Sequence, residues 1–372
     1  MKFIINKFLI VNVLAKIQGL TGRRSNLAIT ENVLIRSDAD GIHLTATDLE
    51  TGFEGNYPAS VENEGAIAVS AKKLYEILKE FPSEEILIHE VENRWIEIGN
   101  GKVQYHIVGM NPEDFPETPH ITDVDFFSIE ANSLEKMISR STIISAAGDE
   151  KRAHINGVYV ERIEEEGKFM LRFVSTDGSR LNAVDHIYSS QGSMPTIDGV
   201  LVPKKGLNEV AKFLDIEGDV QVGIKDSNFI IKKEKETIII RMLEGEFPQY
   251  RDILKKGEEH LINLNKTKFG KMLKRMSILA TDNYKGAVFN FSDNNLVVTA
   301  TNPDYGESKE ETEIEFSGES IEAAFNPKFF MDTLSVIDDE NVIVNIVDGN
   351  RPCILEGESD KTFISVIMPM RI

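Results

Sequence analysis

The sequence predicts an α+β protein built from three similar domains in a row, because two separate landmarks each occur three times. The first landmark is an apolar run that ends in threonine followed by an acid or amide. The second is an amphipathic segment that opens with lysine. The threonines are Thr47, Thr176 and Thr301, and the lysines are Lys72, Lys204 and Lys328. Both sets are spaced by about a third of the 372 residues, so the repeated unit has the size of a domain.

Each repeat shows the same order of predicted elements. A short strand comes first, at residues 2–5, 126–129 and 259–264. An amphipathic helix follows, at residues 7–18, 133–144 and 266–279. Alternating strands come next, then a second helix that begins near the repeated lysine, then further strands. Ser70 is a candidate N-cap for the second helix of the first repeat. Each repeat is therefore expected to pack two helices on β-sheet.

Prolines and acids cluster where one repeat ends and the next begins. Residues 112–119 read PEDFPETP, and a second Phe-Pro pair stands at Phe247 and Pro248. Such segments are typical of connections between folded units. The predicted domains are residues 1–122, 123–256 and 257–372.

Composition indicates folded domains in a reducing compartment. The chain is 41% hydrophobic and 27% charged, and its single cysteine, Cys353, excludes an internal disulfide. The apolar start is interrupted by Asn6, Lys7 and Asn12 and lacks a small-residue cleavage site, so we expect a strand and a helix there. No run approaches the roughly 18 apolar residues of a membrane-spanning helix. The expected location is the cytoplasm, without membrane contact.

Charge is distributed unevenly. The net charge is −20, which disfavours tight binding of the whole surface to a phosphate backbone. Residues 1–30 nevertheless hold five basic residues and no acid, and residues 266–276 do the same. For any single helix, lysines on a solvated face would explain this equally well. Recurrence in equivalent helices favours one basic surface on an otherwise acidic protein.

Reactive side chains do not converge in the sequence. Asp48 and Asp177 recur at equivalent positions, which favours a turn-forming role over paired catalytic carboxylates. No two of the seven histidines have zinc-ligand spacing, and no phosphate-binding Gly-x-x-x-x-Gly-Lys-Ser/Thr loop occurs. Cys353 lies in an apolar, strand-like context and is expected to be buried. We expect no catalytic residue, no metal and no cofactor.

Several motifs, spread from end to end, resemble the bacterial sliding clamp family, the β subunit of DNA polymerase III. The matching segments are MKF at 1–3, ATDLE at 46–50, INGV at 155–158, STDGSRL at 175–181, VPKKG at 202–206, GEFPQY at 245–250, NP at 302–303 and MPMRI at 368–372. Each motif alone is weakly specific. Their order and threefold spacing make the resemblance specific, and it covers the whole chain.

The resemblance implies a head-to-tail homodimer that closes into a ring of six like domains around duplex DNA. Helices line the hole and bind phosphates without sequence preference. The ring itself performs no reaction. Such a ring is a processivity factor, which tethers the replicative polymerase. The DNA-facing residues expected from the basic helices are Arg23, Arg24, Lys72, Lys136, Arg140, Lys204, Lys205, Lys271 and Lys274.

The resemblance also implies a pocket between the second and third domains for a short Gln-x-x-Leu-Phe-like peptide. Its ligands would come from the catalytic subunit of the replicative polymerase, the clamp loader, repair polymerases, and mismatch-repair and ligase-type proteins. The matching residues are Ile155, Thr176, Gly178, Ser179, Arg180, Leu181, Pro248, Ile253, Val366, Met368, Pro369, Met370 and Arg371. Methionines suit a pocket that takes varied apolar anchors. By periodicity alone, the final VIMPMRI is equally well a last core strand.

Ring closure requires an unpaired strand edge at each end of the chain. The candidates are residues 102–108, with Tyr105 and Ile107, and residues 296–301 with the adjoining Ile278 and Leu279. These apolar residues would alternatively fill their own domain cores. The chain departs from many relatives at Ser25–Ala28, where they carry prolines, and this puts the rigidity of the loop after Arg24 in question.

Two function classes stay open from the sequence. One is a DNA-encircling processivity factor. The other is a triplicated scaffold that binds proteins without encircling DNA. A closed DNA circle would retain an encircling processivity factor until the DNA is cut. Retention of a scaffold that does not encircle DNA would not depend on DNA topology.

Overall fold

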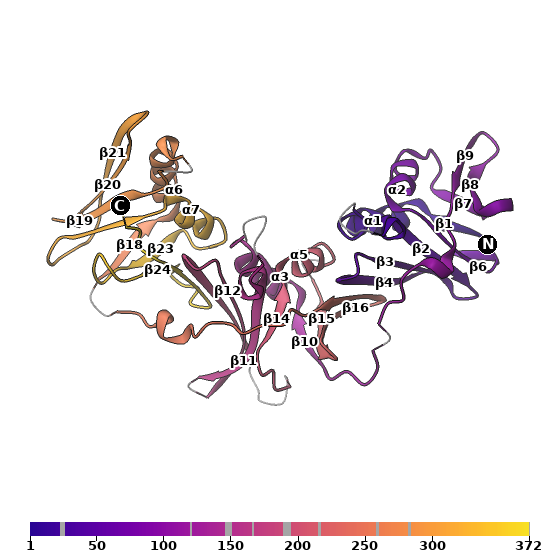
Figure 1. Cartoon of the computed structure of the whole chain (residues 1–372), viewed down its shortest axis with the longest axis horizontal. Coiled ribbons are helices and arrows are strands. Elements are labelled where there is room, and N and C mark those ends of the chain that lie inside the picture. Colours follow the sequence, from indigo (N-terminus) through magenta and orange to yellow (C-terminus); the bar gives the residue numbers. More distant parts are fainter. Residues whose placement is uncertain are drawn as a thin grey trace. The chain divides into compact units, whose positions relative to one another are not determined.

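The computed structural model describes residues 1–22, 27–119, 121–145, 151–165, 167–188, 195–214, 217–257, 260–281 and 284–371 (Figure 1). The described residues form two compact units. Unit 1 lies chiefly within Met1–Glu135 and Val202–Met242. Unit 2 lies chiefly within Lys136–Gln191 and Leu243–Ile372.

Unit 1 contains a five-stranded antiparallel sheet. In order across the sheet, the strands are β5 (Ser60–Asn63), β1 (Lys2–Asn6), β7 (Glu85–Glu90), β8 (Trp95–Asn100) and β9 (Val103–Val108). Phe3 and Ile5 of β1 are buried, because alternate residues of a strand face the core. Helices α1 (Lys7–Lys16) and α2 (Ala71–Glu80) pack against each other. They agree with the predicted pair of helices in the first repeat.

A second sheet of unit 1 has eight antiparallel strands. Their order is β10 (Phe126–Glu130), β15 (Asp219–Lys225), β16 (Asn228–Lys233), β17 (Glu236–Arg241), β4 (Thr51–Tyr57), β3 (Gly41–Thr47), β2 (Asn32–Asp38) and β6 (Gly65–Ser70). At its centre β17 pairs with β4, with Ile239 opposite Gly52. Strands of the first and second repeats therefore share one hydrogen-bonded sheet. Helix α5 (Lys204–Ala211) contacts β17.

Unit 2 repeats this arrangement with another eight-stranded antiparallel sheet. Its order is β14 (Val200–Pro203), β11 (Gly157–Glu165), β12 (Lys168–Thr176), β13 (Arg180–Tyr188), β25 (Phe363–Ile367), β24 (Cys353–Gly357), β23 (Asn341–Asn345) and β18 (Leu261–Asn265). Here β13 pairs with β25, with Val366 opposite Leu181. Helices α3 (Ala131–Thr142) and the short α4 (Ala153–Asn156) precede β11 in the chain.

The last sheet of unit 2 has four strands, in the order β21 (Gly306–Glu313), β20 (Asn295–Asn302), β19 (Ala287–Ser292) and β22 (Ile321–Phe325). Helices α6 (Lys266–Met276) and α7 (Pro327–Ser335) pack side by side in this unit (Figure 1). Phe269, Met272, Leu273 and Met276 of α6 are buried, as their spacing predicts. The single-turn helix η7 (Ser277–Leu279) continues α6.

Helix starts follow local side-chain chemistry. The hydroxyl of Ser70 accepts a hydrogen bond from the amide of Lys73 (3.3 Å), which confirms the predicted N-cap. The corresponding caps of α1, α6 and α7 are Asn6, Asn265 and Asn326. In the first and third repeats, the first helix therefore begins directly after its strand at an asparagine.

One predicted sheet edge is correct and the other is wrong. Strand β9 ends the five-stranded sheet, so residues 103–108 form an edge as expected. Residues 296–301 lie in β20, which pairs with β19 on one side and β21 on the other. The edge strands of that sheet are β21 and β22, and the predominantly acidic sequence of β21, GESKEETE, lacks the apolar pattern used to choose the edge.

Candidate functional site

A tight turn between β12 and β13 forms one wall of the candidate site in unit 2. The hydroxyl of Thr176 donates to the carbonyl of Arg180 (2.7 Å) and accepts from the amide of Gly178 (3.0 Å). The carboxylate of Asp177 accepts from the amides of Ser179 (2.9 Å) and Arg180 (3.1 Å). Gly178 has φ +88°, which glycine adopts without steric strain. The Thr-Asp pair is thus a turn-forming device, as its recurrence predicts.

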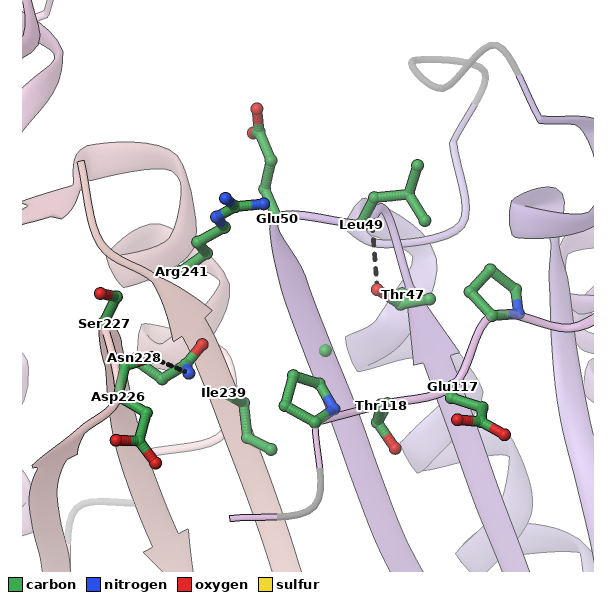
Figure 2. A pocket seen from close by; sticks show the side chains of 13 residues that line it. Thr47, Leu49, Glu50, Glu117, Thr118, Asp226, Ser227, Asn228, Ile239 and Arg241 are labelled. Carbon is green, nitrogen blue, oxygen red and sulfur yellow. Dashed lines mark hydrogen bonds between the residues drawn. The ribbon is translucent and has the colours of Figure 1, made fainter. Parts of the chain in front are cut away.

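The same turn occurs in unit 1 between β3 and β4 (Figure 2). The hydroxyl of Thr47 donates to the carbonyl of Thr51 (3.1 Å) and accepts from the amide of Leu49 (3.0 Å). Asp48 accepts from the amides of Glu50 (3.1 Å) and Thr51 (2.8 Å). The third repeat uses the side-chain amide of Asn302 instead of a carboxylate.

Arg180 anchors the unit 2 turn to helix α7. Its buried guanidinium forms ion pairs with Asp177 (3.1 Å) and Asp332 (2.8 Å). It also lies over the ring of Phe329, 4.4 Å from the centroid. Paired in this way, Arg180 holds the turn against α7 and does not present a free charge to a ligand.

The C-terminal segment forms a second wall. The amide of Met368 donates to the carbonyl of Ser179 (2.9 Å), and the amide of Met370 donates to the carbonyl of Ala324 (2.7 Å). The two methionine side chains stay 39% and 37% exposed. The backbone is thus fixed while two adaptable apolar side chains remain available for contact.

A cavity of about 1090 Å³ lies among these segments. Its lining is Gly178, Ser179, Ser277, Ala280, Thr281, Lys285, Asn326, Pro327, Lys328, Phe329, Met331, Met368, Pro369, Met370 and Arg371. Its size and its mixture of apolar and polar groups suit a short peptide. The final VIMPMRI is therefore both a core strand, through β25, and a cavity wall, through Met368–Arg371.

The predicted pocket residues divide into three groups. Lining the cavity are Gly178, Ser179, Met368, Pro369, Met370 and Arg371. Buried are Ile155, Thr176, Arg180, Leu181 and Val366, and exposed are Pro248 and Ile253. Leu181 and Val366 pack in one apolar cluster with Tyr250 and, at its margin, Phe247. The structure thus brings the turn and the C-terminal residues together, with an apolar cluster beneath the strand pair.

Sequence reasoning missed the side of the cavity formed by η7 and α7. Phe329 and Met331 line the cavity and are half-buried, whereas Phe330 and Leu334 are buried in the core. Three consecutive apolar residues, Phe329 to Met331, are wider than the single stripe that a helix needs for its core. This excess of apolar residues is the sequence signal that could have identified them.

The predicted DNA-facing residues fall into exposed and buried sets. Lys72, Lys136, Lys271 and Lys274 are exposed on α2, α3 and α6. Arg140 and Lys204 are buried, so the prediction that they face DNA is wrong. Lys205 is half-buried and paired with Asp48 in unit 1. Arg23 and Arg24 lie outside the described residues.

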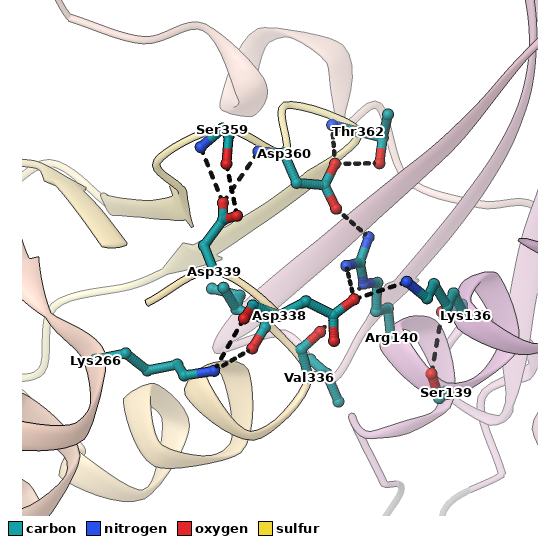
Figure 3. Close-up of polar contacts among 11 residues, drawn as sticks. Lys136, Ser139, Arg140, Lys266, Val336, Asp338, Asp339, Ser359, Asp360 and Thr362 are labelled. Carbon is teal, nitrogen blue, oxygen red and sulfur yellow. Dashed lines mark hydrogen bonds and ion pairs between the residues drawn. The ribbon is translucent and has the colours of Figure 1, made fainter. Parts of the chain in front are cut away.

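Arg140 is the centre of a polar network in unit 2 (Figure 3). Only 4% of its side chain is exposed. It pairs with Asp360 (2.8 Å) and Asp338 (3.6 Å), and its Nε donates to the carbonyl of Val336 (3.2 Å). Lys136 pairs with the same Asp338 (2.8 Å). An arginine held in this way cannot reach a phosphate without breaking several of these bonds, which is why Arg140 does not face DNA.

The network lowers the pKa of the Asp360 carboxyl. Partial burial by itself would raise the pKa of this carboxyl. Hydrogen bonds from Thr362 and the charge of Arg140 act in the opposite direction and prevail, so the pKa lies below its usual value. Asp360 therefore stays ionised and stabilises Arg140 at neutral pH.

The predicted interface residues lie on two elements. Tyr105 is exposed and Ile107 is half-buried on the edge strand β9. Ile278 is 74% exposed and Leu279 is half-buried on η7. The side-chain amide of Asn302 donates to the carbonyl of Leu279 (2.7 Å) and fixes η7 against β20.

The cysteine and the metal-ligating residue types are candidate reactive groups. Cys353 is buried, as predicted, and burial raises its thiol pKa to about 12. In the described part of the chain, no three His, Cys, Asp or Glu side chains are grouped to hold a metal ion. Over the same residues, no helix is long and apolar enough to cross a membrane.

Family comparisons cover nearly the whole chain. Residues 1–119 match the N-terminal domain of the DNA polymerase III beta subunit, residues 128–249 match its central domain, and residues 251–371 match its C-terminal domain. Three tandem clamp domains, each with helices on β-sheet, are thereby established.

Individual relatives agree. The beta sliding clamp of Chlamydia pneumoniae is 27% identical over 372 residues, which span 100% of this chain and 99% of the relative. The sliding clamp structure from Pseudomonas aeruginosa is 28% identical with a TM-score of 0.91, and that from Bartonella birtlesii, bound to griselimycin, is 25% identical with a TM-score of 0.92. Each structure covers 100% of both chains. The chain belongs to the DNA polymerase III beta-subunit family, the beta sliding clamps.

Proposed function

We propose that the chain is a DNA sliding clamp that encircles duplex DNA as a head-to-tail homodimer and tethers the replicative polymerase. The observation that carries this proposal is the succession of three clamp-domain matches in the family's order. Members of this family are non-catalytic subunits of DNA polymerase III, so the chain contributes processivity and no chemistry. Its expected location is the cytoplasm.

For DNA contact we propose the exposed lysines Lys72, Lys136, Lys271 and Lys274, with Arg23 and Arg24 retained from the sequence. Long, exposed ammonium groups make weak, sequence-blind phosphate contacts, which permit sliding. The acidic remainder, at a net charge of −20, disfavours binding of DNA elsewhere on the surface.

For partner binding we propose the cavity bounded by the Gly178–Ser179 turn and Met368–Arg371. Its exposed methionines accommodate different apolar anchors, which suits polymerases, the clamp loader and repair proteins that share one short motif. For the three domains of the chain we propose the limits 1–122, 123–256 and 257–372.

A labelled peptide ending in Gln-Leu-x-Leu-Phe, titrated into the full chain, tests the partner site. We expect saturable binding near micromolar, about −8 kcal/mol. Deletion of residues 370–372 should abolish it, whereas Ile187→Ala, an exposed apolar residue of β13 outside the cavity lining, should not. Equal binding to the deletion variant would place the peptide elsewhere.

DNA topology tests encirclement separately. After loading onto a nicked circle, the protein should be retained until the circle is cut to linear DNA. Retention that does not change on linearisation would favour a scaffold that binds DNA without encircling it.

A further inference from the structure

Unit 1 contains an internal counterpart of the proposed partner site. In unit 1, β4 follows the Thr47–Asp48 turn and pairs with β17, so that Gly52 stands opposite Ile239. In unit 2, β13 follows the Thr176–Asp177 turn and pairs with β25 in the same register. The two junctions are therefore built on one plan.

The unit 1 junction holds a cavity of about 430 Å³ (Figure 2). Its floor is the pair Gly52 and Ile239, and its walls are the Leu49–Glu50 turn, the connection 116–119 and the hairpin 226–228. The Leu49–Glu50 wall is held against β17, because the amide of Arg241 donates to the carbonyl of Glu50 (2.8 Å). The cavity is thus formed by the fold before any ligand binds.

Three differences between equivalent positions of the two junctions give the unit 1 cavity its own chemistry. The register places Gly52 where unit 2 has Leu181, and the missing side chain deepens the floor. Leu49 stands where unit 2 has Gly178, so a 48% exposed apolar side chain forms the rim. In place of Met368, unit 1 has Arg241.

The charge of the lining is predominantly negative. Glu50, Glu117 and Asp226 contribute carboxylates and Arg241 contributes the one cation of the lining, while Glu50 is also paired with Lys205 (3.8 Å) outside the lining. Among the described residues, neither Glu117 nor Asp226 has an ion-pair partner, and both are exposed. A ligand with cationic side chains on either side of an apolar one would match this distribution.

We propose that the cavity of unit 1 is a second docking site, which takes a short extended peptide with an apolar side chain flanked by lysine or arginine. The apolar side chain enters above Gly52 and packs on Ile239 and Leu49. The flanking cations meet Glu117 and Asp226. The peptide class follows from the equivalence with the unit 2 cavity, so this inference rests on the proposed function, whereas the preference for basic flanks is specific to unit 1.

Methyl NMR of the full chain, labelled at isoleucine and methionine methyls, tests the proposal. The probe is acetyl-Gly-Lys-Leu-Arg-Gly-amide, and the comparison probe carries glutamate at both basic positions. We expect a saturable shift of the Ile239 methyl with the basic probe and none with the acidic one. Titration of the Gln-Leu-x-Leu-Phe peptide into the same labelled chain should shift Met370, which lines the unit 2 cavity, so failure at Ile239 is distinguishable from failure of the partner site.

Charge variants identify the site. Combining Glu117→Lys with Asp226→Lys should weaken the basic probe about fivefold, as expected for two exposed ion pairs. Combining Glu64→Lys with Glu92→Lys alters the net charge equally at exposed positions outside the lining and should leave affinity unchanged. Gly52→Val should abolish the Ile239 shift by filling the floor, with other methyl signals showing that the fold persists.

Two results would overturn the proposal. One is no saturable shift at Ile239 in the unaltered chain. The other is an equal loss of affinity in both double variants, because that would mean general attraction of a cation to an acidic protein.

Discussion

At the scale of single residues, the same residue type serves different purposes according to its surroundings. Gly178 supports a left-handed backbone in the turn, with φ +88°, whereas Gly270 lies inside the regular helix α6. A side chain is strained at the first position and favoured at the second. A paired substitution can therefore separate backbone conformation from side-chain packing.

Gly178→Ala should destabilise unit 2 by about 1 kcal/mol, because alanine resists the left-handed region. A Cβ at Gly178 would meet no atom within 4 Å, so the backbone alone accounts for this cost. Gly270→Ala should stabilise the same unit by up to about 1 kcal/mol. Hydrogen exchange of the β13 and α6 amides measures both; a shift of the same sign in the two variants would contradict the prediction.

Arg140→Met should destabilise unit 2 by about 2 kcal/mol, since the variant loses several charge-assisted hydrogen bonds while keeping most of the apolar volume. Exposed Lys255→Met is the control and should change stability little. The stabilities of the two variants are compared by thermal unfolding and by hydrogen exchange of amides near β25. Equal effects of the two variants would show that Arg140 is not an anchor.

Acid should weaken the Arg140 network in a defined direction. The folded pKa of Asp360 is lowered, so its contribution is complete above the unfolded pKa, near 4, and is lost as pH falls through the folded value. Arg140→Met should lose less stability between neutral pH and pH about 3 than the unaltered chain. Parallel stability curves in this range would exclude the linkage.

At the scale of elements, the sequence predicted the helices and first strands closely because their signals are local. The repeat landmarks identified α2, α5 and α7, and Ser70 capped its helix as predicted. Edge strands and buried charged residues were harder to predict from the sequence. Which strand stands at an edge depends on tertiary pairing, and β21 carries an acidic pattern that resembles a surface loop. Arg140 resembled a phosphate ligand because its carboxylate partners lie about two hundred residues away.

Helix α6 should carry part of the DNA affinity. Lys271→Ala combined with Lys274→Ala should lower the slope of log affinity against log salt by about 2, one unit for each phosphate that the variant no longer neutralises. Lys255→Ala with Lys361→Ala removes the same charge from other elements and should leave the slope unchanged. Fluorescence anisotropy with duplex DNA over a salt series provides the measurement, and equal slopes in both variants would remove α6 from the DNA-facing set.

At the scale of the whole molecule, the repeat and the resemblance predicted the three-domain organisation, whereas the division of the fold into two units came only from the structure. A shared sheet depends on pairing between distant strands such as β4 and β17. Pattern reasoning detects each strand but not its partner across a domain boundary. The cavity of unit 1 was missed for the same reason.

Tyr105→Glu should weaken the proposed homodimer, because it puts a carboxylate on the β9 edge, which has none, opposite the acidic β21 of a second copy. Leu261→Glu, an exposed apolar residue of edge strand β18, is the matched control and should leave the dimer intact. Sedimentation at several concentrations distinguishes them. An unchanged dimer in Tyr105→Glu would exclude β9 from the interface.

The pairing of β4 with β17 has a consequence for dividing the chain. A cut in the connection 116–119 would separate β4 from β17 and leave each fragment with one newly unpaired strand edge. The two edges are complementary along five residue pairs. Such fragments should reassociate when mixed, since each covers the other's unpaired backbone groups. The protein thus contains a natural position for a split reporter, in which reassembly of the two fragments regenerates a folded unit.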